Sequence, residues 1–441
     1  MTVADTVAPL VRAVLGPQVP VGIKCWDGSR SGPPDAPWQV RIVNRRGLRR
    51  LLWAPNDLGF ARAYVSGDID IEGDLLAGLD ALEQVSDPSR GPGVRIDGQT
   101  KKALVKAALR LGIIGPPPKP PAEEMKPARG HRHDKGRDAA AISHHYDVGN
   151  DFYQLVLGES MTYSCAYWVQ QSEDLGAAQY AKCDLVARKL GLTAGMRVLD
   201  VGCGWGTFAL HAARHYGTHV VGVTLSQEQA DYASKRMVDA GVGELVQIRV
   251  QDYRDVTDGP YDAISSIGMA EHVGAAMLAT YAADLFALLR PRGRLLNHAI
   301  SRRPGTLAPF SKTSFIDRYV FPDGEISPLA TMIEALEGAG FEVRDVESLR
   351  EHYALTLRAW VANLEANWDE AVAQSSAGQA RVWRLYMAGA ALGFAANRLG
   401  INQVLAVKCT EQGRSGMPGT RAELLQSSAP KPSPPGHSDE L

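Results

Sequence analysis

The chain has 441 residues, of which 45% are hydrophobic and 22% are charged, and its formal net charge is −2. These values are typical of a globular protein with more than one domain, and they exclude a disordered or fibrous chain. The near-zero charge also excludes bulk attraction to a polyanion, so we expect no nucleic-acid partner and only local attraction to phosphate.

Five cysteines (Cys25, Cys165, Cys183, Cys203 and Cys409) form no CxxC pair, which argues against a zinc finger or a disulfide framework. This usage indicates a reducing compartment. The first residues, MTVADTVAPLVRAVLG, do not resemble a signal peptide, and no run of 18 uncharged apolar residues predicts a membrane span. We expect a cytoplasmic protein that would reach lipid only from the inner membrane surface.

The first 115 residues are predicted to form a small α+β domain. VGIKCW, WQVRIVN and the segment around LRRLLWA alternate as strands do, and the turn clusters DGSRSGPPDAP and APNDLG separate them. A helix is expected from about residue 74. Because this region contains no recognisable nucleophile, base or metal-ligand cluster, a packing, dimerisation or membrane role is the simplest interpretation.

Residues 101–140 contain ten basic and four acidic residues, a local charge of +6. KKALVKAALRLGIIG has helical spacing with basic residues opposite its apolar positions, and the Pro-rich stretch 116–140 that follows is predicted to be a linker. Two interpretations stay open. The region is either a solvated connection between domains or a surface that lies on anionic lipid headgroups.

From 141 to 412 the chain alternates strands and helices. MRVLDV, HVVGVTL, LVQIRV, YDAISSI, RGRLLNHAI and FEVRDVESL have strand length, with helical patterns such as QEQADYASKRMVDAG between them. This alternation predicts an α/β domain with a mostly parallel sheet covered by helices on both faces. Residues 413–441, rich in Pro and Ser towards the end, are predicted to be a disordered tail.

A glycine-rich loop follows the first strand of this domain. VLDVGCGWG places Asp200, Gly202, Gly204 and Gly206 as D-x-G-x-G-x-G just before a helix. The spacing is not that of a dinucleotide fingerprint, and no Gly-Lys-Ser/Thr follows as in a P-loop. The loop therefore favours S-adenosylmethionine as the ligand.

The next two strand ends support this interpretation. The second strand ends at Thr224, with Gln229 shortly after it, where a dinucleotide-dependent dehydrogenase would place an acid. The third strand ends with Asp252 and Tyr253, a carboxylate acceptor beside an aromatic ring, which suits the amino group and the face of an adenine.

Eight motifs in this order resemble the cyclopropane-fatty-acyl-phospholipid synthase family, which includes the mycolic acid cyclopropane synthases. They are HHYDVGNDFY (144–153), MTYSCAYW (161–168), VLDVGCGWG (198–206), GVTLSQEQ (222–229), QDYRD (251–255), SIGMAEHVG (266–274), RYVFPDGE (318–325) and HYALTL (352–357). The resemblance implies a class I methyltransferase fold, Rossmann-like with a seven-stranded sheet, and S-adenosylmethionine as the methyl donor. It extends over about residues 141–410.

The resemblance also implies site residues. The positions that match the family's donor-binding residues include Tyr163, Ser164, Trp205 and Leu225, in addition to those named above. The positions that match its bicarbonate ligands are Cys165, Glu271, His298, Ile300 and Tyr353. In that family the bicarbonate ion acts as the base, and its oxygens accept hydrogen bonds from groups such as these.

Within the family, segments such as ARAYVSGDIDIEGD and LYMAGAALGFAAN look most like the actinobacterial methyltransferases of tuberculostearic acid synthesis. That likeness implies an oleoyl phospholipid acceptor, a 10-methylene product, a separate reductase that saturates it, and a homo-oligomer. The alternative product is a cyclopropane. Ala270 stands where the bacterial cyclopropane enzymes usually have Phe, which we interpret as a wider pocket beside the base.

Simpler explanations remain for single residues. Without the resemblance, His298 would be a core histidine and Glu271 an ordinary acid at a helix start. Cys165 has no Pro-Cys context for a covalent nucleophile, and His144 with His145 lacks a regularly spaced third metal ligand, so no metal is expected. The apolar spacing of 354–398 fits core packing or the roof of an acyl tunnel. A catalytically silent lipid-binding protein is the alternative from another functional class.

Overall fold

The computed structural model describes residues 1–15, 21–86, 98–125, 149–170, 173–305, 314–322 and 324–426. The chain forms two compact units. Unit 1 comprises Met1–Pro127, Ser311–Pro322 and Leu364–Leu392, and unit 2 comprises Ala128–Phe310, Asp323–Asn363 and Gly393–Leu441. The sequence placed a single boundary at 116–140, whereas two later segments also belong to unit 1. Their side chains bond to its N-terminal residues, as Arg381 does to Asp70 at 2.8 Å.

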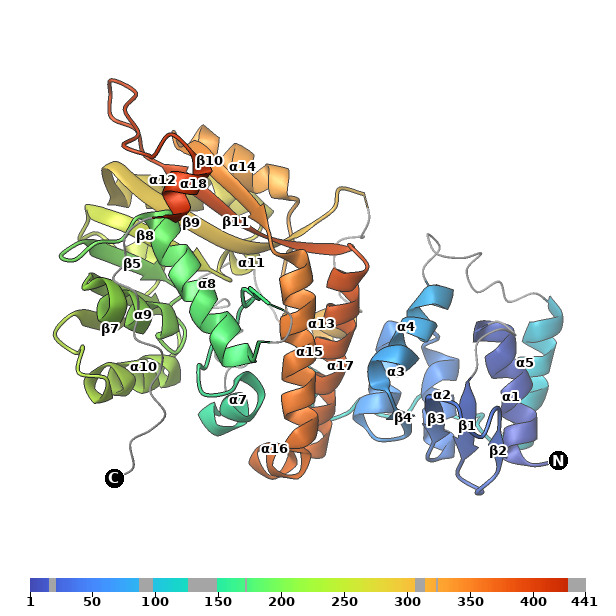
Figure 1. Cartoon of the computed structure of the whole chain (residues 1–441). Helices are drawn as coiled ribbons and strands as arrows, with labels where there is room; N and C mark the ends of the chain where they lie inside the picture. Colours follow the sequence, from blue (N-terminus) through green and yellow to red (C-terminus); the bar gives the residue numbers. More distant parts are fainter. Residues whose placement is uncertain are drawn as a thin grey trace. The chain divides into compact units, whose positions relative to one another are not determined.

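Unit 2 is built on a seven-stranded sheet with the order β10-β11-β9-β8-β5-β6-β7 (Figure 1). Its strands are β5 (Arg197–Val201), β6 (His219–Thr224), β7 (Val246–Val250), β8 (Tyr261–Ile267), β9 (Leu289–Arg302), β10 (Glu342–Ser348) and β11 (Leu399–Val407). All neighbouring strands pair in parallel except β11, which is antiparallel to both β9 and β10. The predicted mostly parallel seven-stranded sheet is confirmed.

Six of these strands are the six apolar runs identified in the sequence, and β11 is the one that was missed. Its residues 401–407 are all buried, but Asn402 and Gln403 interrupt the apolar run. A buried amide in a central strand is tolerated where it finds a hydrogen-bond partner. Asn402 donates to Ser301 Oγ at 2.7 Å.

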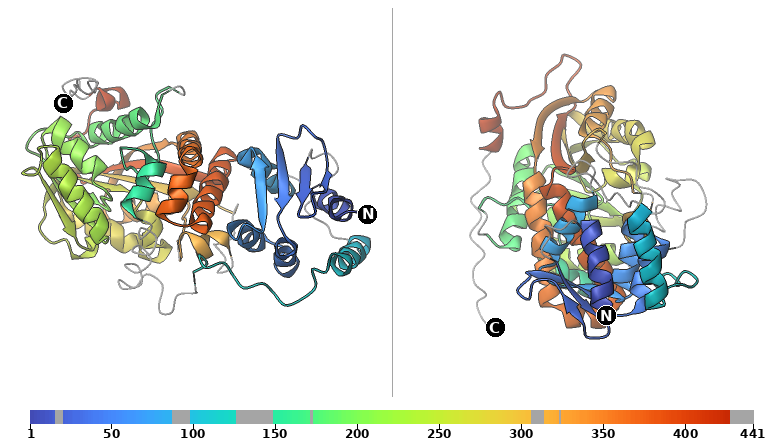
Figure 2. Two further views of the ribbon diagram at one scale, coloured as in Figure 1. Left: turned by 90° about the horizontal axis from the view of Figure 1, so that it is seen from below. Right: turned by 90° about the vertical axis from the view of Figure 1, so that its right-hand side faces the viewer.

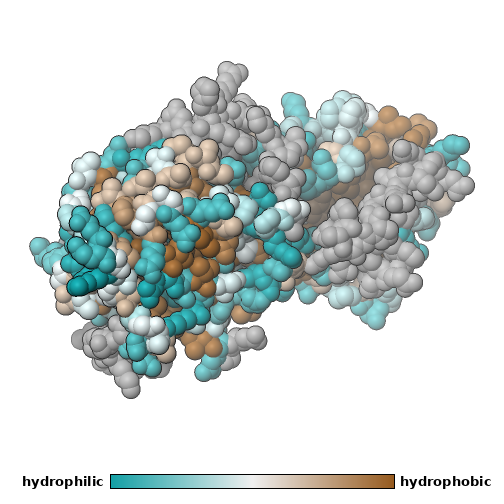
Figure 3. Space-filling view, turned by 90° about the horizontal axis from the view of Figure 1, so that it is seen from above, coloured by the Kyte–Doolittle hydropathy of each residue, from teal (hydrophilic) through white to brown (hydrophobic). Residues whose placement is uncertain are grey.

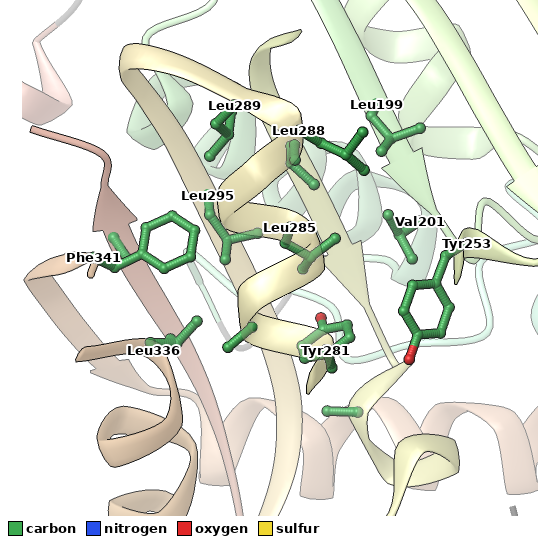
Figure 4. Close-up of a cluster of buried hydrophobic side chains, with 14 of the residues drawn as sticks. Leu199, Val201, Tyr253, Tyr281, Leu285, Leu288, Leu289, Leu295, Leu336 and Phe341 are labelled. Atoms are coloured by element: carbon green, nitrogen blue, oxygen red, sulfur yellow. The ribbon is translucent and has the colours of Figure 1, made fainter. Parts of the chain in front are cut away.

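Helices cover both faces of the sheet. One core contains side chains of α8 (Leu175–Leu190), α9 (Thr207–Tyr216), α10 (Gln227–Asp239) and α18 (Arg421–Leu425). The other contains side chains of α11 (Ala270–Val273), α12 (Leu278–Leu288) and α14 (Leu329–Gly338), as Figure 4 shows in part. Successive strand residues such as Val198 and Leu199 enter opposite cores. This is the period of two that a strand buried on both faces requires.

Three further helices complete the described part of unit 2 or reach into it. They are α7 (Asn150–Leu157), α15 (Arg350–Ala366) and α17 (Ala377–Ala395), the last two with residues in both units. The short 3-10 turns η1 (Tyr253–Asp255) and η2 (Ala275–Met277) follow β7 and α11.

The predicted disordered tail is wrong for residues 413–426. Helix α18 lies within it, and Leu424 is buried in the core beside α8. Arg421 pairs with Asp345 at 3.1 Å, and Leu425 accepts a hydrogen bond from Arg188 at 3.0 Å. The composition of this stretch is polar, but a buried leucine, an ion pair and a hydrogen bond hold a single helical turn in place. Residues 427–441 lie outside the described residues.

Unit 1 is an α+β unit with a four-stranded sheet of order β2-β1-β3-β4 (Figure 2). The strands are β1 (Gly22–Cys25), β2 (Arg30–Ser31), β3 (Trp38–Ile42) and β4 (Ile69–Gly73). The helices are α1 (Val3–Leu15), α2 (Arg45–Trp53), α3 (Asp57–Val65), α4 (Leu75–Ser86), α5 (Gly98–Leu111), α13 (Phe315–Tyr319) and α16 (Trp368–Gln374). The predicted helix start near residue 74 is confirmed by α4.

The segment around LRRLLWA is helix α2, so its prediction as a strand is wrong. The Asn44 side chain caps the helix by accepting from the Arg46 amide at 2.9 Å. The buried residues of α2 are Gly47 and Arg50, three apart as on one helix face. Because one of the two buried residues is an arginine, the helical period does not show in the pattern of hydrophobic residues. Its charge is matched by Asp68 at 2.9 Å.

Residues 116–125 of the predicted linker are held in unit 1 by Glu124. Its side chain is fully buried and receives two hydrogen bonds from Arg62 at 2.6 Å and one from Arg318 at 2.7 Å. Burial costs a lone carboxylate several kcal/mol, so these paired cations are what allows it to be there. Glu124 is thus a buried anchor in a segment that has no helix or strand and whose other residues are exposed or only partly buried. Residues 126–140 lie outside the described residues.

Among the described residues, no helix is long and apolar enough to cross a membrane. Hydrophobic residues nevertheless reach the surface between hydrophilic ones, as the face displayed in Figure 3 shows. Single exposed apolar side chains are normal, and only groups of them indicate a function.

Candidate active site

A cavity of about 1230 Å³, part of it open to solvent, lies in unit 2 at the carboxyl ends of β5, β6, β7 and β8. Eleven of the twelve predicted donor-binding residues line it. They are Tyr163, Ser164, Asp200, Gly202, Gly204, Trp205, Thr224, Leu225, Gln229, Asp252 and Tyr253. Carboxyl ends of parallel strands are where doubly wound sheets bind their ligands. The fold thus brings residues spread over 91 positions to one cavity.

The twelfth residue, Gly206, has a packing role. It caps α9 with φ of 78°, and a Cβ there would come within 2.7 Å of Met237 Cε and 3.0 Å of Ala233 Cβ on α10. Gly202 has φ of 74°, and a Cβ there would meet Met269 Cγ at 2.8 Å. The two glycines therefore allow the loop to turn and to pass close to its neighbours.

Polar side chains are fixed along the cavity wall. Thr224 Oγ1 donates to Gln229 Oε1 at 2.8 Å, which holds both at the end of β6. Asp252 receives two hydrogen bonds from the Arg254 side chain, at 2.8 and 2.6 Å, which orient its carboxyl group. Tyr253 packs edge-on against Tyr281 with ring centroids 5.6 Å apart. The wall thus offers acceptors and an aromatic side chain to an adenosine.

Helix α8 supplies two residues that the sequence analysis missed. Gln179 Nε2 donates to Ser164 O at 2.9 Å, and Lys182 Nζ donates to Ser164 Oγ at 3.1 Å, so both position the loop that contains Tyr163. Lys182 is 2% exposed and lines the cavity. Among the described residues, no carboxylate lies within ion-pair distance of its ammonium. A buried cation without a counter-ion at a cavity wall suits an anionic group of a ligand.

Asp200 is also buried at this wall. Its Oδ1 accepts from Ser265 Oγ at 2.6 Å. Burial raises the pKa of Asp200 to about 6, against the opposing effects of the Ser265 hydrogen bond and the Lys182 charge. The carboxylate is thus poised to gain from a cationic or donor group in the cavity.

A second group of predicted residues surrounds the end of β9. His298 and Ile300 belong to this strand, and Glu271 belongs to α11, which follows the adjacent strand β8. The Ile300 amide donates to Glu271 Oε1 at 2.7 Å. Ile401, opposite Ile300 on β11, accepts from the Leu349 amide at 2.9 Å, which brings the start of α15 to this strand end.

The remaining two residues of this group meet at Leu349. Tyr353 donates its amide to Leu349 O at 3.0 Å, and the Cys165 thiol lies 3.7 Å from the same oxygen. The YSCAYW loop is further fixed to α15, because Trp168 donates its amide to His352 Nδ1 at 2.9 Å and its indole to Thr356 at 3.1 Å. His352 and Thr356 were missed as positioning residues. Only the fold shows that these two motifs touch.

Glu271 as a whole is partly buried, but its carboxyl group is shielded from solvent. This burial raises its pKa to about 7, although the hydrogen bonds from the Ile300 amide and from its own amide lower it. Its Oε2 has no hydrogen-bond partner among the described residues. Because Oε1 already accepts from Ile300, a proton on this carboxyl group belongs on Oε2, where it can be donated to a ligand.

His298 is fully buried and lies opposite Gln403 in the β9–β11 pair. Burial and the charges of Lys182 and Lys189 place its pKa well below the ordinary value, so the ring is neutral. Its Nδ1 is 3.5 Å from Gln403 Nε2, and its Nε2 has no partner among the described residues. If Gln403 donates to Nδ1, the ring proton lies on Nε2 and is available to a ligand.

The Cys165 thiol is a poor candidate for a nucleophile. It is completely buried, it donates to Ala166 O at 3.2 Å, and burial raises its pKa above the ordinary value. A nucleophilic cysteine needs the opposite, a thiolate stabilised by a nearby base or cation. Across the described residues there is also no group of three metal-ligating side chains, and His144 and His145 lie outside them.

Comparison with known proteins agrees with this geometry. The profile of the mycolic acid cyclopropane synthetase family matches residues 133–404. The chain is 42% identical to the probable fatty acid methyltransferase Rv3720 of Mycobacterium tuberculosis, over 91% of this chain and 94% of that protein. It is 38% identical to a probable fatty acid methyltransferase of Pseudomonas putida, over 95% of this chain and all of the relative.

Among solved structures, the mycolic acid cyclopropane synthase CmaA1 in complex with SAH and CTAB superimposes with a TM-score of 0.57. It shares 33% sequence identity with this chain, covering 61% of this chain and 97% of CmaA1. The resemblance read from the eight motifs is thus confirmed. The chain belongs to the mycolic acid cyclopropane synthetase family, as an S-adenosylmethionine-dependent methyltransferase of the cyclopropane synthase type.

Proposed function

We propose that this protein transfers a methyl group from S-adenosylmethionine to the cis double bond of an oleoyl chain in a phospholipid, giving a 10-methylene branch, the precursor of tuberculostearic acid. Among the described residues, several buried polar side-chain atoms have no hydrogen-bond partner, and two of them, Glu271 Oε2 and His298 Nε2, belong to positions that match the family's bicarbonate ligands. These two atoms support the proposal most directly. An ordinary methyl transfer to a nucleophilic oxygen or nitrogen needs only one base. Two buried polar atoms suit a site that handles a proton away from water.

The chemistry explains why such a site is needed. An alkene is a weak nucleophile, so the sulfonium methyl must be held in line with it, and proximity supplies much of the acceleration. Methyl transfer leaves a carbocation on the neighbouring carbon, which water would quench. An apolar and closed surrounding is therefore required. Loss of one proton after a hydride shift gives the exocyclic methylene group, whereas direct loss from the new methyl group closes a cyclopropane.

The resemblance to the cyclopropane synthases implies a bicarbonate ion as the base. When bound, such an ion would accept the proton that the carbocation releases. Glu271, His298 and Tyr353 would hold it, since neutral Glu271 and His298 have donor positions without partners among the described residues. The Ile300 amide donates to Glu271 in this structure, so it would position the ion through that carboxyl group and not by a direct hydrogen bond.

The test is incubation of the purified protein with dioleoyl phospholipid and isotopically labelled S-adenosylmethionine, followed by NMR of the released fatty ester. We expect signals of an exocyclic methylene group that contains the label. Cyclopropane signals would instead establish the alternative product, which the name of CmaA1 supports. No incorporation of label into lipid would contradict both and leave the silent lipid-binding protein as the remaining interpretation.

Ala270 precedes Glu271 and lines a smaller cavity of about 360 Å³ with Glu271 and Ile300. We expect Ala270→Phe to shift the product from methylene towards cyclopropane, because a larger side chain narrows the space beside the carbocation and disfavours the hydride shift. A series of Val, Leu and Phe at this position should shift the ratio in steps. Gas chromatography with NMR of the esters measures it, and a constant ratio across the series would refute this role.

The proposal includes the surroundings of the reaction. A phospholipid acceptor places the protein at the inner membrane surface, a methylene product requires a partner reductase that saturates it, and the family suggests a homo-oligomer. Binding to lipid vesicles tests the location at the membrane surface, and chemical cross-linking tests the homo-oligomer.

A further inference from the structure

The solvent face of α5 in unit 1 is not polar throughout. Positions 102, 105, 106 and 109 lie on one face by their i, i+3, i+4 and i+7 spacing, and the opposite residues Ala107 and Ala108 are buried. Lys102 and Lys106 on the exposed face alternate with Val105, which is 58% exposed, and Leu109, which is 66% exposed. Packing within unit 1 does not account for two aliphatic side chains in water.

The C-terminal end of α2 and the residues just after α5 add further exposed hydrophobic side chains. Leu52, Trp53 and Ile114 are 45%, 57% and 53% exposed. Trp53 donates its indole N–H to Gly115 O at 2.9 Å, and Arg49 Nε donates to Ile113 O at 2.9 Å. These bonds tie α2 to the loop that follows α5.

We call the exposed residues Leu52, Trp53, Val105, Leu109 and Ile114 the α2/α5 surface. They are five of the eleven large hydrophobic side chains that are exposed among the described residues. Such clustering in two short segments is unlike the scattered exposure of an ordinary surface.

The two segments that form the α2/α5 surface contain charges of one sign. Residues 45–53 contain four basic residues and residues 98–119 contain five, and neither segment contains Asp or Glu. For the described residues, the carboxylate partner of these cations is Asp68, which pairs with Arg46 and Arg50. Most of this positive charge is therefore available to an outside partner.

We propose that the α2/α5 surface docks this protein on an anionic phospholipid membrane; this rests on the proposed function, which takes its acyl chain from such a membrane. Aliphatic side chains and a tryptophan would enter the headgroup boundary while lysine and arginine pair with anionic headgroups. A nucleic acid would match the charge but would gain nothing from exposed Val105 and Leu109. A protein partner would need an acidic surface, and the experiment below distinguishes a protein partner from a membrane.

The experiment measures binding of the full-length protein to fluid vesicles of diphytanoyl phosphatidylglycerol and phosphatidylcholine, which contain no double bond and so do not engage the reaction. The double variant Lys106→Gln/Leu109→Gln should bind at least roughly tenfold more weakly, since one surface cation alone contributes about a fivefold change. The single variant Val105→Gln should show a smaller loss in the same direction. Vesicles of phosphatidylcholine alone should bind the wild type weakly.

Helix α10 offers a matched control, because Lys235 and the 69% exposed Val238 have the same spacing and exposure on another surface. Lys235→Gln/Val238→Gln should leave vesicle binding within about twofold. Equal losses in both double variants, or no preference for anionic vesicles, would overturn the proposal. The proposal would also be overturned if the protein self-associates in solution and only Lys106→Gln/Leu109→Gln, the α5 variant, abolishes this. The α2/α5 surface would then be a protein interface.

Methyl transfer to detergent-dispersed dioleoyl phospholipid should be the same in the wild type and in the α5 variant. If neither the wild type nor the α5 variant shows methyl transfer, but the α5 changes weaken vesicle binding as expected, the proposed function fails and the docking surface stands. If methyl transfer occurs while vesicle binding is unaffected by the α5 changes, the docking surface fails alone.

Discussion

Replacing Glu271 with glutamine should lower turnover by at least about 100-fold and leave the affinity for S-adenosylmethionine within about twofold. Glutamine has nearly the same volume, and its Oε1 can still accept from the Ile300 amide, 2.7 Å away in the wild type. It cannot take up or release a proton. Initial rates on dioleoyl phospholipid and calorimetric titration with the donor measure the two effects.

A pH series separates this role from a merely structural one. In the folded protein the pKa of Glu271 is about 7, above its ordinary 4.5, because the carboxyl group is buried. The folded state therefore binds this proton more tightly than the unfolded chain. The stability that the proton provides is complete below pH 4.5 and is lost as pH rises through 7, a difference of roughly 3 kcal/mol.

Glu271→Gln should lack this loss, so its free energy of unfolding should fall less than that of the wild type between pH 4.5 and pH 7. Urea denaturation at several pH values measures it. Glu325, whose Oε2 accepts from the Ala275 amide at 3.2 Å, offers a neighbouring control. Glu325→Gln should retain turnover. Two results would contradict the proton-handling role of Glu271. One is full turnover in Glu271→Gln, and the other is the same pH dependence of unfolding free energy in Glu271→Gln and in the wild type.

Replacing Lys182 with methionine should weaken binding of S-adenosylhomocysteine by roughly 30-fold, the size expected for one charge-assisted hydrogen bond. Lys182 is buried at the donor cavity, and its ammonium donates to Ser164 Oγ at 3.1 Å. We expect the carboxylate of the donor's methionine moiety to be its counter-ion. Methionine keeps the length and the apolar stem of lysine, so the packing of α8 should survive.

A smaller ligand provides the control for Lys182. Methylthioadenosine lacks the amino-acid end, so its affinity should be nearly the same in Lys182→Met and in the wild type. Ser164→Ala removes the hydroxyl partner and keeps the charge, so it should change both affinities only a few-fold. Equal losses for both ligands in Lys182→Met would mean that the lysine maintains the fold and does not bind the carboxylate.

Much of the site could be predicted because its signals are local. The glycines of 202–206 follow a strand and precede a helix, and Thr224 and Asp252 stand at successive strand ends. In a parallel sheet these ends must meet at one edge, so sequence order alone brings them together. Lys182 gave no such signal, because a lysine within a helix is normally solvated.

The strand predicted for LRRLLWA failed for another reason. The run alternates well enough for a strand, and likewise nothing in the composition of 116–125 indicates that Glu124 is buried. In each segment a buried charge, Arg50 or Glu124, is compensated by a partner distant in sequence, Asp68 or the Arg62–Arg318 pair. The pattern of hydrophobic residues along a sequence does not indicate which buried charges are paired in this way.

The sequence by itself determined the α/β class, most of the predicted residues that line the cavity and the membership of a family, because these depend on short-range order: strand, glycine turn, helix. Tertiary structure alone decided which groups are buried without a partner. Among the described residues, two such groups are Glu271 Oε2, just after β8, and His298 Nε2, on the adjacent strand β9. Their protonation and their readiness for a ligand follow from burial, and burial depends on every element that the fold packs around them.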